Sequence, residues 1–307
     1  MREIRSVKLI GLGAMGCFFA PRLEALLGGN FKIIAKGERA KRLSEKGVIV
    51  NGKQYIFDIA DENNADTDLI IIAVKGYSLE EALEDIKPYV GENTLIMCVI
   101  NGVNSENRVR ELYGEEHLIY SYMRVSIVMK DGVTNFDPSI GKVHFGDKKN
   151  VPGAYSENVL AIQKLLEAAT IPYEIDEDMI RGIWFKFSCN VGENMTCAML
   201  NIPFGAFQIS DSANYIRETG MREVIAIANK LGINLSEDDV IRQRDTLMGL
   251  PFENKPSTLQ DIEAEKLTEV DMFAGEVVRL GEQYGVSTPL ARVYLESIRA
   301  KEDLFGR

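Results

Sequence analysis

The sequence contains few residues of the kinds that bind zinc or build disulfide frameworks. Its 307 residues include only four cysteines and two histidines. These residues are Cys17, Cys98, Cys189, Cys197, His117 and His144. The cysteines form no CxxC pair and no histidine cluster accompanies them, so we expect no metal site of the Cys/His type. A disulfide framework is typical of much smaller secreted chains and is not expected here either.

Long apolar runs are also missing. No segment approaches the 18 or so consecutive apolar residues that predict a membrane span. The opening MREIRSVKLIGLG leads directly into a strand pattern and has no apolar stretch suited to a signal peptide. These observations favour a cytoplasmic protein with no membrane partner.

Basic residues are outnumbered by acidic ones. Lys and Arg total 35 against 46 Asp and Glu, which gives a formal net charge of −11. Surfaces that bind nucleic acid normally carry a basic patch that displaces counterions from phosphates, so we expect no nucleic-acid partner. An anionic cofactor can still bind to an acidic protein where cations are concentrated locally.

The first half of the chain alternates short apolar runs with helical patterns. The strand candidates are Val7–Ile10, Phe31–Ala35, Leu69–Val74, Thr94–Ile100 and His117–Tyr122, and the helix candidates are Ala14–Leu27, Glu38–Lys46, Leu79–Val90 and Ser105–Tyr113. Strands that are apolar on both faces and separated by helices predict a parallel sheet of βαβ units. Two hairpins are predicted beside this sheet, one over Val48–Ile59 around Asn51-Gly52 and one over Ser126–Gly146 around Asp131-Gly132.

After about residue 176 the strand patterns disappear. The helix candidates there are Asp178–Leu200, Ser212–Leu231, Ser236–Met248, Pro256–Lys266, Glu269–Tyr284 and Pro289–Leu304. Ser236 and Thr288-Pro289 are typical helix starts, and Gly232 and Gly285 are typical helix ends. We therefore predict an α/β Rossmann-type dinucleotide-binding domain over residues 1–175, followed by an all-α domain over residues 176–307.

A glycine-rich turn follows the first strand and opens the first helix. It consists of Gly11, Leu12, Gly13, Ala14, Met15 and Gly16. In GxGxxG the first glycine makes a tight turn, the second lets the backbone approach a diphosphate, and the third lets the helix pack on the strand. A lone GxGxxG is a weak signal, but its place at the start of βα units predicts a dinucleotide site.

The residues after the second strand bear on which nicotinamide cofactor binds. NAD sites usually carry Asp or Glu there, about 20 residues past the motif, to bind the ribose hydroxyls. This chain has Lys36, with Arg39 close behind, and these cations would neutralise a 2′-phosphate. We therefore predict NADP(H). The alternative is that Glu38 binds the ribose and that Lys36 is only a solvated strand end.

The helix around Lys186 carries the sharpest cluster of polar residues. Lys186, Asn190 and Asn194 are spaced four apart, so in an α-helix they share a face that drifts by about 40° per step. Most of their neighbours are apolar, and burying such polar groups without partners is costly. The cluster therefore predicts that these side chains find polar partners or face a wet cavity. The alternative is a solvent-facing stripe on an ordinary amphipathic helix.

Other candidates are less specific. Lys75 and Asn101 end the third and fourth strands, where ligands bind in open α/β sheets. The alternative is that either is a loop residue without a functional role. Thr268 with Asp271 has the pattern of a helix N-cap with an acidic third position, which makes Glu269 the first helical residue. The helix dipole alone favours an acidic residue in a first turn, so Glu269 can equally have a purely structural role.

Together these features resemble the ketopantoate (2-dehydropantoate) reductase family. The matching segments, in order, are GLGAMG at 11–16, AVKGY at 73–77, INGV at 100–103, K-x3-N-x3-N at 186–194, S-x-L-x-D at 257–261, T-E-V-D-x3-G at 268–275 and GVSTP at 285–289. The resemblance spans roughly residues 5 to 300. It implies a Rossmann domain joined to a helical domain of the 6-phosphogluconate dehydrogenase C-terminal type, with the substrate in the cleft between them.

The resemblance also implies residue roles. Lys186 looks like the proton donor. Asn190, Asn194 and Ser257 look like substrate ligands, and Asn101 looks like a residue that touches both cofactor and substrate. Lys75 and Glu269 look like residues close to the cofactor, NADP.

Two departures put the particular substrate in doubt. Family members often have Asn where this chain has Phe204, before Gly205, and the segment with Arg124 lacks the usual small residues. Three hypotheses remain: a 2-dehydropantoate 2-reductase of pantothenate and coenzyme A biosynthesis, a reductase of another small 2-oxo acid, and a dinucleotide sensor without turnover. Because helical second domains of this kind often associate, we expect a homodimer.

Overall fold

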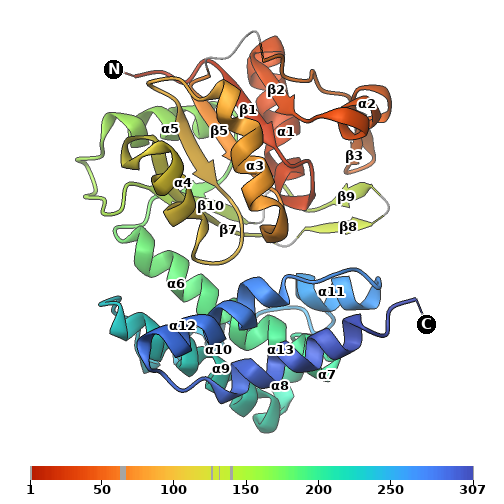
Figure 1. The fold of residues 1–307 in the computed structure, drawn as a ribbon, viewed down its shortest axis with the longest axis vertical. Coiled ribbons are helices and arrows are strands. Elements are labelled where there is room, and N and C mark those ends of the chain that lie inside the picture. The colour runs from red at the N-terminus through yellow and green to blue at the C-terminus, as the bar shows by residue number, and fades with distance from the viewer. Residues whose placement is uncertain (1, 63–66, 126, 131, 139–140, 307) are drawn as a thin grey trace. The chain divides into compact units, whose positions relative to one another are not determined.

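The structure, a computed structural model, describes residues 2–62, 67–125, 127–130, 132–138 and 141–306. The chain divides into two units, Met1–Met179 and Ile180–Arg307. Strands occur in the first unit, whereas every regular element in described residues 180–306 is helical (Figure 1). The predicted fold class, a Rossmann-type α/β domain followed by an all-helical one, is confirmed.

A seven-stranded sheet organises the first unit. Its strands are β1 (Val7–Ile10), β2 (Phe31–Ile34), β5 (Leu69–Ile72), β6 (Leu95–Cys98), β7 (Leu118–Arg124), β10 (Lys142–Gly146) and β11 (Tyr173–Glu174). They lie in the order β11-β10-β7-β6-β5-β1-β2, and every pair from β7 to β2 is parallel. All side chains of β1, β5 and β6 are buried, which is the pattern of a parallel sheet covered on both faces. The five predicted parallel strands are confirmed.

Helices connect these strands. They are α1 (Ala14–Leu27), α2 (Gly37–Lys46), α3 (Leu79–Ile86), α4 (Ser105–Tyr113) and α5 (Glu157–Ala168). The predicted bounds of α1 and α4 are confirmed, while α3 ends four residues early because the chain tightens into a 3-10 turn over Lys87–Tyr89. Helix α5 was not predicted. Its N-cap, Ser156, accepts a hydrogen bond from the backbone N–H of Val159 at 3.2 Å.

A small sheet with the strand order β4-β3-β9-β8 also belongs to the first unit. Its strands are β3 (Val48–Val50), β4 (Lys53–Tyr55), β8 (Val128–Lys130) and β9 (Val133–Asn135). Asn51 and Gly52 join β3 to β4 with φ of 48° and 78°, the positive values that a two-residue hairpin turn requires. Of the second predicted hairpin, Ser126 and Asp131 lie outside the described residues, and β8 pairs antiparallel with β9.

The second hairpin prediction was wrong at its C-terminal end. β10 does not continue the small sheet but pairs antiparallel with β7 in the large one. The reason is burial: Val143 and Phe145 of β10 are both 0% exposed and belong to the main core of the first unit.

The second unit is built from helices. They are α6 (Met179–Cys189), α7 (Met195–Leu200), α8 (Ala206–Ile209), α9 (Asp211–Lys230), α10 (Glu237–Met248), α11 (Ser257–Glu263), α12 (Glu276–Tyr284) and α13 (Pro289–Glu302). Two segments are π-helical, Asn190–Asn194 between α6 and α7 and Asp271–Gly275 before α12. The predicted helix end at Gly285 is confirmed, with φ of 66° in the left-handed region.

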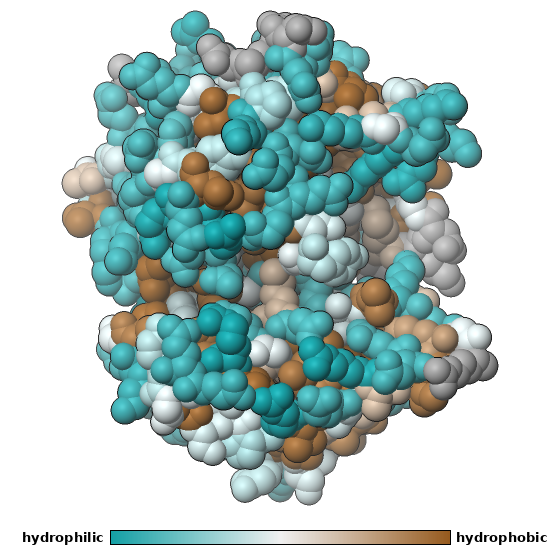
Figure 2. Space-filling view, viewed as in Figure 1, coloured by the Kyte–Doolittle hydropathy of each residue, from teal (hydrophilic) through white to brown (hydrophobic). Residues whose placement is uncertain are grey.

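Hydrophilic residues dominate the face of the molecule shown in Figure 2, with hydrophobic residues scattered among them. The strongly exposed hydrophobic side chains include Ile209, Tyr77 and Tyr215. Within the part of the chain that the structure describes, no helix combines the length and the apolar character that crossing a membrane requires.

Candidate active site

Predicted site residues of the first unit gather at one edge of the large sheet. Strand β1 lies between β2 and β5, β5 lies beside β6, and all these pairs are parallel. Parallel strands carry their carboxyl ends to the same edge, where ligands bind in open α/β sheets at the point where the strand order reverses. The residues that follow the ends of β1, β2, β5 and β6 there are Gly11, Lys36, Lys75 and Asn101.

The three glycines of the turn meet different surroundings. Gly11 has φ of +97°, and a Cβ atom on it would lie 2.5 Å from the backbone oxygen of Ala73. A Cβ atom on Gly16 would lie 1.9 Å from the backbone oxygen of Gly11, so the first turn of α1 packs against the backbone that directly follows β1. At Gly13, by contrast, no described atom lies within 4 Å of such a Cβ atom. Two glycines are therefore required by packing, and the middle one faces open space.

The start of α1 fits a diphosphate group. Gly13 is its N-cap, and among the described residues no side chain caps the helix and no acidic residue stands in its first turn. Leu12 is buried, whereas Ala14 and Met15 are half-buried. Free N–H groups at a helix start bind anions, and the missing Cβ at Gly13 leaves room for one to approach.

Lys36 already has two acidic neighbours. Its Nζ lies 3.0 Å from a carboxylate oxygen of Asp85 and 3.5 Å from one of Glu62, and its side chain is 52% exposed. The hydrogen bond to Asp85 is the main reason why the pKa of Lys36 is raised. A 2′-phosphate at this strand end would have to compete with these carboxylates for the ammonium group.

Lys75 and Asn101 are both half-buried at the sheet edge. The backbone oxygen of Lys75 accepts a hydrogen bond from the N–H of Ser78 at 2.9 Å, which fixes the short 3-10 turn Gly76–Ser78. Asn101 is followed by Gly102, whose φ of +100° turns the chain sharply after β6.

In the second unit, Lys186 lies near the end of α6. Its neighbours Phe185 and Phe187 are 6% and 1% exposed, whereas Lys186 is half-buried. The lysine is therefore on the less buried side of a helix that is otherwise packed into the unit.

The regular α-helical drift expected from Lys186 to Asn194 is wrong. The helix changes to π-helical hydrogen bonding over Asn190–Asn194 before α7 begins. A π-turn closes from residue i to i+5 and so takes in one residue more than an α-turn. This widened turn carries both asparagines, and such turns often occur at functional sites.

The two asparagines are placed to bind a polar group. Asn194 is only 8% exposed. The side-chain nitrogen of Asn190 is buried, and no hydrogen-bond acceptor among the described residues lies within its reach. Because an unsatisfied buried donor is costly, this amide fits a site that is completed by an acceptor on a ligand.

Ser257 and Glu269 differ in exposure. Ser257 is exposed as the first residue of α11, a helix that packs against the π-helical segment Asn190–Asn194. Glu269 is 5% exposed and lies just before the second π-helical segment, Asp271–Gly275, which also contacts the first. The second unit thus brings the segments carrying Asn190, Asn194, Ser257 and Glu269 together.

The predicted helix start at Glu269 needs correction. The helix begins at Val270, whose N–H donates to Thr268 Oγ1 at 3.1 Å. Asp271 does not close a capping box but pairs with Arg299 of α13 at 2.6 Å. Thr268 is held instead by Glu302, whose Oε1 accepts hydrogen bonds from its N–H and its hydroxyl, each at 2.7 Å. Glu269 is therefore a buried residue that precedes the helix.

Phe204 belongs to a hydrophobic cluster. It packs against the buried group Cys197, Phe207, Ala213, Leu247 and Leu259. Its backbone N–H donates to the oxygen of Asn254 at 2.8 Å, close to the start of α11. The position beside the Ser257 helix is thus apolar in this chain.

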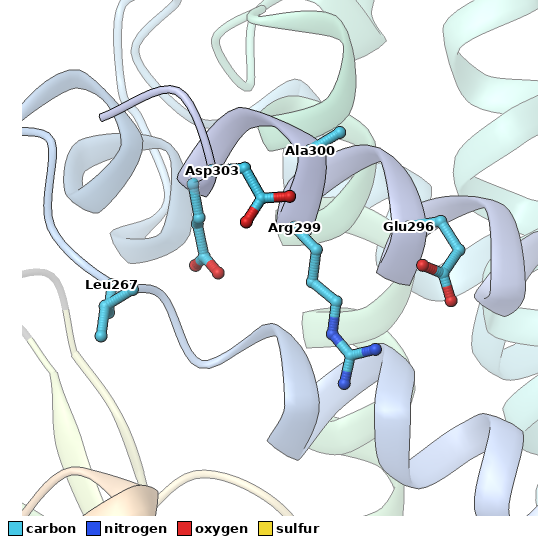
Figure 3. Close-up of a pocket in the computed structure, with 6 residues that line it drawn as sticks. Leu267, Glu296, Arg299, Ala300 and Asp303 are labelled. Atoms are coloured by element: carbon cyan, nitrogen blue, oxygen red, sulfur yellow. The ribbon is translucent and has the colours of Figure 1, made fainter. Parts of the chain in front are cut away.

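Two surface hollows have linings that contain none of the predicted site residues. One, of about 490 Å³, is lined by Leu267, Glu296, Arg299, Ala300, Glu302 and Asp303 beside α13 (Figure 3). The other, of about 510 Å³, is lined by residues 2–5, 26–27, 30, 161, 164–165 and 168. Among the described residues, no group of three or more His, Cys, Asp and Glu is arranged to hold a metal ion.

Comparisons with known proteins cover most of the chain. A family model described as ketopantoate reductase PanE/ApbA matches residues 7–150, and one described as ketopantoate reductase PanE/ApbA C terminal matches residues 178–302. A 2-dehydropantoate 2-reductase of Aquifex aeolicus is 30% identical over 302 residues, with 96% of each chain covered. One of Streptococcus pyogenes serotype M1 is 26% identical over 313 residues, with 96% of this chain and 97% of the relative covered.

Solved structures share the fold. A D-mandelate dehydrogenase in a ternary structure with NADH and anilino(oxo)acetate matches with a TM-score of 0.85 at 23% identity, covering 98% of this chain and 100% of the other. A ketopantoate reductase from Ralstonia eutropha JMP134 gives 0.82 at 22% identity, with the same coverage. A dimeric ketopantoate reductase from Staphylococcus aureus gives 0.79 at 20% identity, again with the same coverage.

Proposed function

Because the chain belongs to the ketopantoate reductase family, we propose that it reduces the ketone of 2-dehydropantoate to pantoate with NADPH, in pantothenate and coenzyme A biosynthesis. The observation that carries this proposal is the buried side-chain nitrogen of Asn190, which has no hydrogen-bond partner among the described residues and lies four residues after Lys186. A donor in that state suits a substrate rich in acceptor oxygens.

Residues 1–175 would hold the cofactor and residues 176–307 would bind the substrate and carry the proton donor. Gly11, Leu12, Gly13, Ala14, Met15 and Gly16 would cradle the diphosphate at the start of α1. Lys36 would meet the 2′-phosphate, and Lys75 and Glu269 would lie near the cofactor. Asn101 would touch both cofactor and substrate, and Asn190, Asn194 and Ser257 would bind the substrate.

The nicotinamide, when bound, supplies the hydride that reaches the ketone carbon. Negative charge then develops on the carbonyl oxygen. The ammonium group of Lys186 would stabilise that charge and give the oxygen its proton, an effect worth several kcal/mol in a preorganised site. The asparagines and the serine would orient the hydroxy acid without adding net charge, which leaves Lys186 as the cation that acts on the reacting oxygen.

A second candidate, reduction of a 2-oxo acid with a bulkier apolar side chain, is favoured by Phe204. That residue makes the wall beside the Ser257 helix apolar where the family often has asparagine. A D-mandelate dehydrogenase solved with NADH shares this fold. An aryl 2-oxo acid is therefore the alternative substrate, and NADH is the alternative cofactor.

Steady-state oxidation of NADPH and of NADH with a panel of 2-oxo acids tests these proposals. The panel includes 2-dehydropantoate, an aryl 2-oxo acid and an unbranched one. We expect the highest kcat/KM with 2-dehydropantoate and NADPH. A higher value with the aryl acid supports the second candidate, a lower KM for NADH than for NADPH reverses the cofactor proposal, and no turnover with any acid leaves only a dinucleotide sensor.

We also propose a homodimer located in the cytoplasm. The Staphylococcus aureus protein of the same fold is dimeric. Light scattering at several protein concentrations measures the assembly directly, and a monomer at all of them contradicts the dimer.

A further inference from the structure

A buried carboxylate lies inside the π-helical turn that carries the two asparagines. Glu193 is 6% exposed, and its Oε1 accepts a hydrogen bond from Gln243 Nε2 at 2.7 Å. Gln243 comes from α10 and is itself 4% exposed. Acidic side chains are rarely fully buried unless they are paired, so the burial of Glu193 points to a specific structural role.

A buried cation lies close to the same carboxylate. Arg217 of α9 is 0% exposed, and its guanidinium donates to Glu218 at 2.9 Å and to Asn214 at 3.2 Å. Burial lowers the pKa of Arg217, and the charge of Glu193 opposes that effect. Glu218 is the direct ion-pair partner of this cation, and the acid in the turn is a second negative charge that acts on it.

The backbone of the π-helical turn packs closely against α9, the helix that carries Arg217. A Cβ atom on Gly192 would lie 2.6 Å from the backbone oxygen of Arg217 and 2.6 Å from Cγ of Met221. A Cβ atom on Gly220 would lie 3.4 Å from Cα of Gly192. Residues 192 and 193 are thus held against α9 and α10.

We propose that Glu193, together with Gln243 and Arg217, is a positioning residue that holds the widened turn in register, so that Asn190 and Asn194 present their amides to the substrate. The proposal rests on the proposed function. Glu193 acts through the asparagines and needs no contact with the reacting atoms.

The physical reason is the helical register. A π-turn contains one residue more than an α-turn, and each residue of an α-helix rotates the next by about 100°. Relaxation of the turn to α-helical geometry would therefore rotate Asn194 relative to Asn190 and change the direction in which the two amides point. A buried, hydrogen-bonded charge opposes such a slip because any other register leaves it unpaired, and fixing register is the best-attested use of buried polar groups.

The test compares Glu193→Leu, Gln243→Leu and the double variant in the full-length protein. Each single change is expected to lower kcat/KM for the 2-oxo acid by roughly 10²-fold, mainly through KM, because small misplacements of binding groups cost that much. The dissociation constant of the cofactor, measured by fluorescence, is expected to stay within about twofold. The double variant is expected to be no worse than either single one, because coupled residues are not additive. Glu193→Gln keeps the acceptor for Gln243, so it should recover part of the loss and it covers the case in which Glu193→Leu does not fold.

The matched control is Glu223→Ala. Glu223 is also a buried carboxylate, but it accepts from the N–H groups of Leu290 and Ala291 at the start of α13 and not from the turn. We expect it to lower Tm and to leave KM within about twofold. If it raised KM as much as Glu193→Leu does, the effect would be general destabilisation and the proposal would be wrong.

Hydrogen exchange separates this proposal from the proposed function. Faster exchange across residues 190–198 in Glu193→Leu, or in Gln243→Leu if that variant does not fold, than in Glu223→Ala supports the positioning role even if the wild type turns over no 2-oxo acid, an outcome that would reject the proposed function alone. Unchanged exchange there together with an unchanged KM overturns the positioning role while leaving the reductase intact.

Discussion

Replacing the second or the third glycine of the turn by alanine should affect two different properties of the protein, ligand binding and folding stability. In Gly13→Ala the added methyl group meets no described atom within 4 Å. In Gly16→Ala it would lie 1.9 Å from the backbone oxygen of Gly11, which cannot rotate away as a side chain can. The first change should therefore affect ligand binding and the second should affect folding.

The magnitudes follow from these surroundings. At Gly13 the backbone has φ of −87° and ψ of −164°, which alanine adopts, so the gain from a less flexible unfolded chain is about 0.4–1 kcal/mol. Alanine is a poorer N-cap than glycine by a similar amount, so the net change in stability should be within about 0.5 kcal/mol. At Gly16, overpacking costs about 1–3 kcal/mol, and the better helix propensity of alanine offsets at most about 1 kcal/mol. We expect a net loss of about 1–2 kcal/mol.

Two measurements separate the variants. Thermal unfolding without cofactor should show that Gly16→Ala lowers the Tm by several degrees, at about 2–4 °C per kcal/mol. The Tm of Gly13→Ala should be nearly that of the wild type. Fluorescence titration should show Gly13→Ala binding both NADPH and NADH at least tenfold more weakly, which is a loss of about 1.4 kcal/mol. Normal cofactor affinity in Gly13→Ala would refute a diphosphate over that residue, and a normal Tm in Gly16→Ala would refute the close packing of α1 against the backbone of Gly11.

Three further predictions concern charge and ionisation. Lys186→Ala should lower kcat by roughly 10²-fold or more with little change in NADPH affinity, and unaltered turnover would remove Lys186 from the mechanism. Asp85→Asn should remove the nearer of the two carboxylates beside Lys36 and lower the Kd for NADPH relative to NADH by up to about fivefold, the range of an exposed ion pair, and an unchanged ratio would mean that Lys36 does not meet the 2′-phosphate. Burial raises the pKa of Cys17, Cys98 and Cys197, so the reactive thiolate fraction at pH 8 is smaller than in a free thiol, and iodoacetamide should label them slowly before unfolding and fully in denaturant.

The sequence predicts the first unit well because its signals are local. The apolar runs, the glycine turn and the Asn51-Gly52 hairpin each lie within a few residues, and the strands and helices they predict are confirmed. Helix α5 carries similar signals, with Ser156 as its cap and buried Val159 and Ile162 on one face, and could have been found in the same way. The pairing of β10 with β7 could not, because it depends on which core takes up Val143 and Phe145.

The candidate site likewise has one part that local sequence signals predict and one part that depends on distant contacts. The glycine turn and the strand ends follow from βα periodicity, so four predicted residues lie at one sheet edge. The spacing of Lys186, Asn190 and Asn194 predicts an α-helical face, yet the helix widens between them. Nothing within that stretch signals the widening, because the residue that holds it, Gln243, is 50 positions away from Glu193.

The two π-helical segments are the parts of the candidate site whose local geometry the sequence pattern does not predict. A π-turn is rarely favoured by its own backbone, so contacts from elsewhere must stabilise it. At the first segment, Gln243 donates a hydrogen bond to Glu193, and the charge of the same carboxylate acts on Arg217. The second segment is flanked by the hydrogen bonds of Asp271 with Arg299 and of Thr268 with Glu302. Such long-range contacts stabilise geometries that propensity disfavours, and local rules are expected to fail most often at functional sites. Both segments adjoin proposed binding residues, so the departure from regular helix is itself a reason to assign function to this part of the second unit.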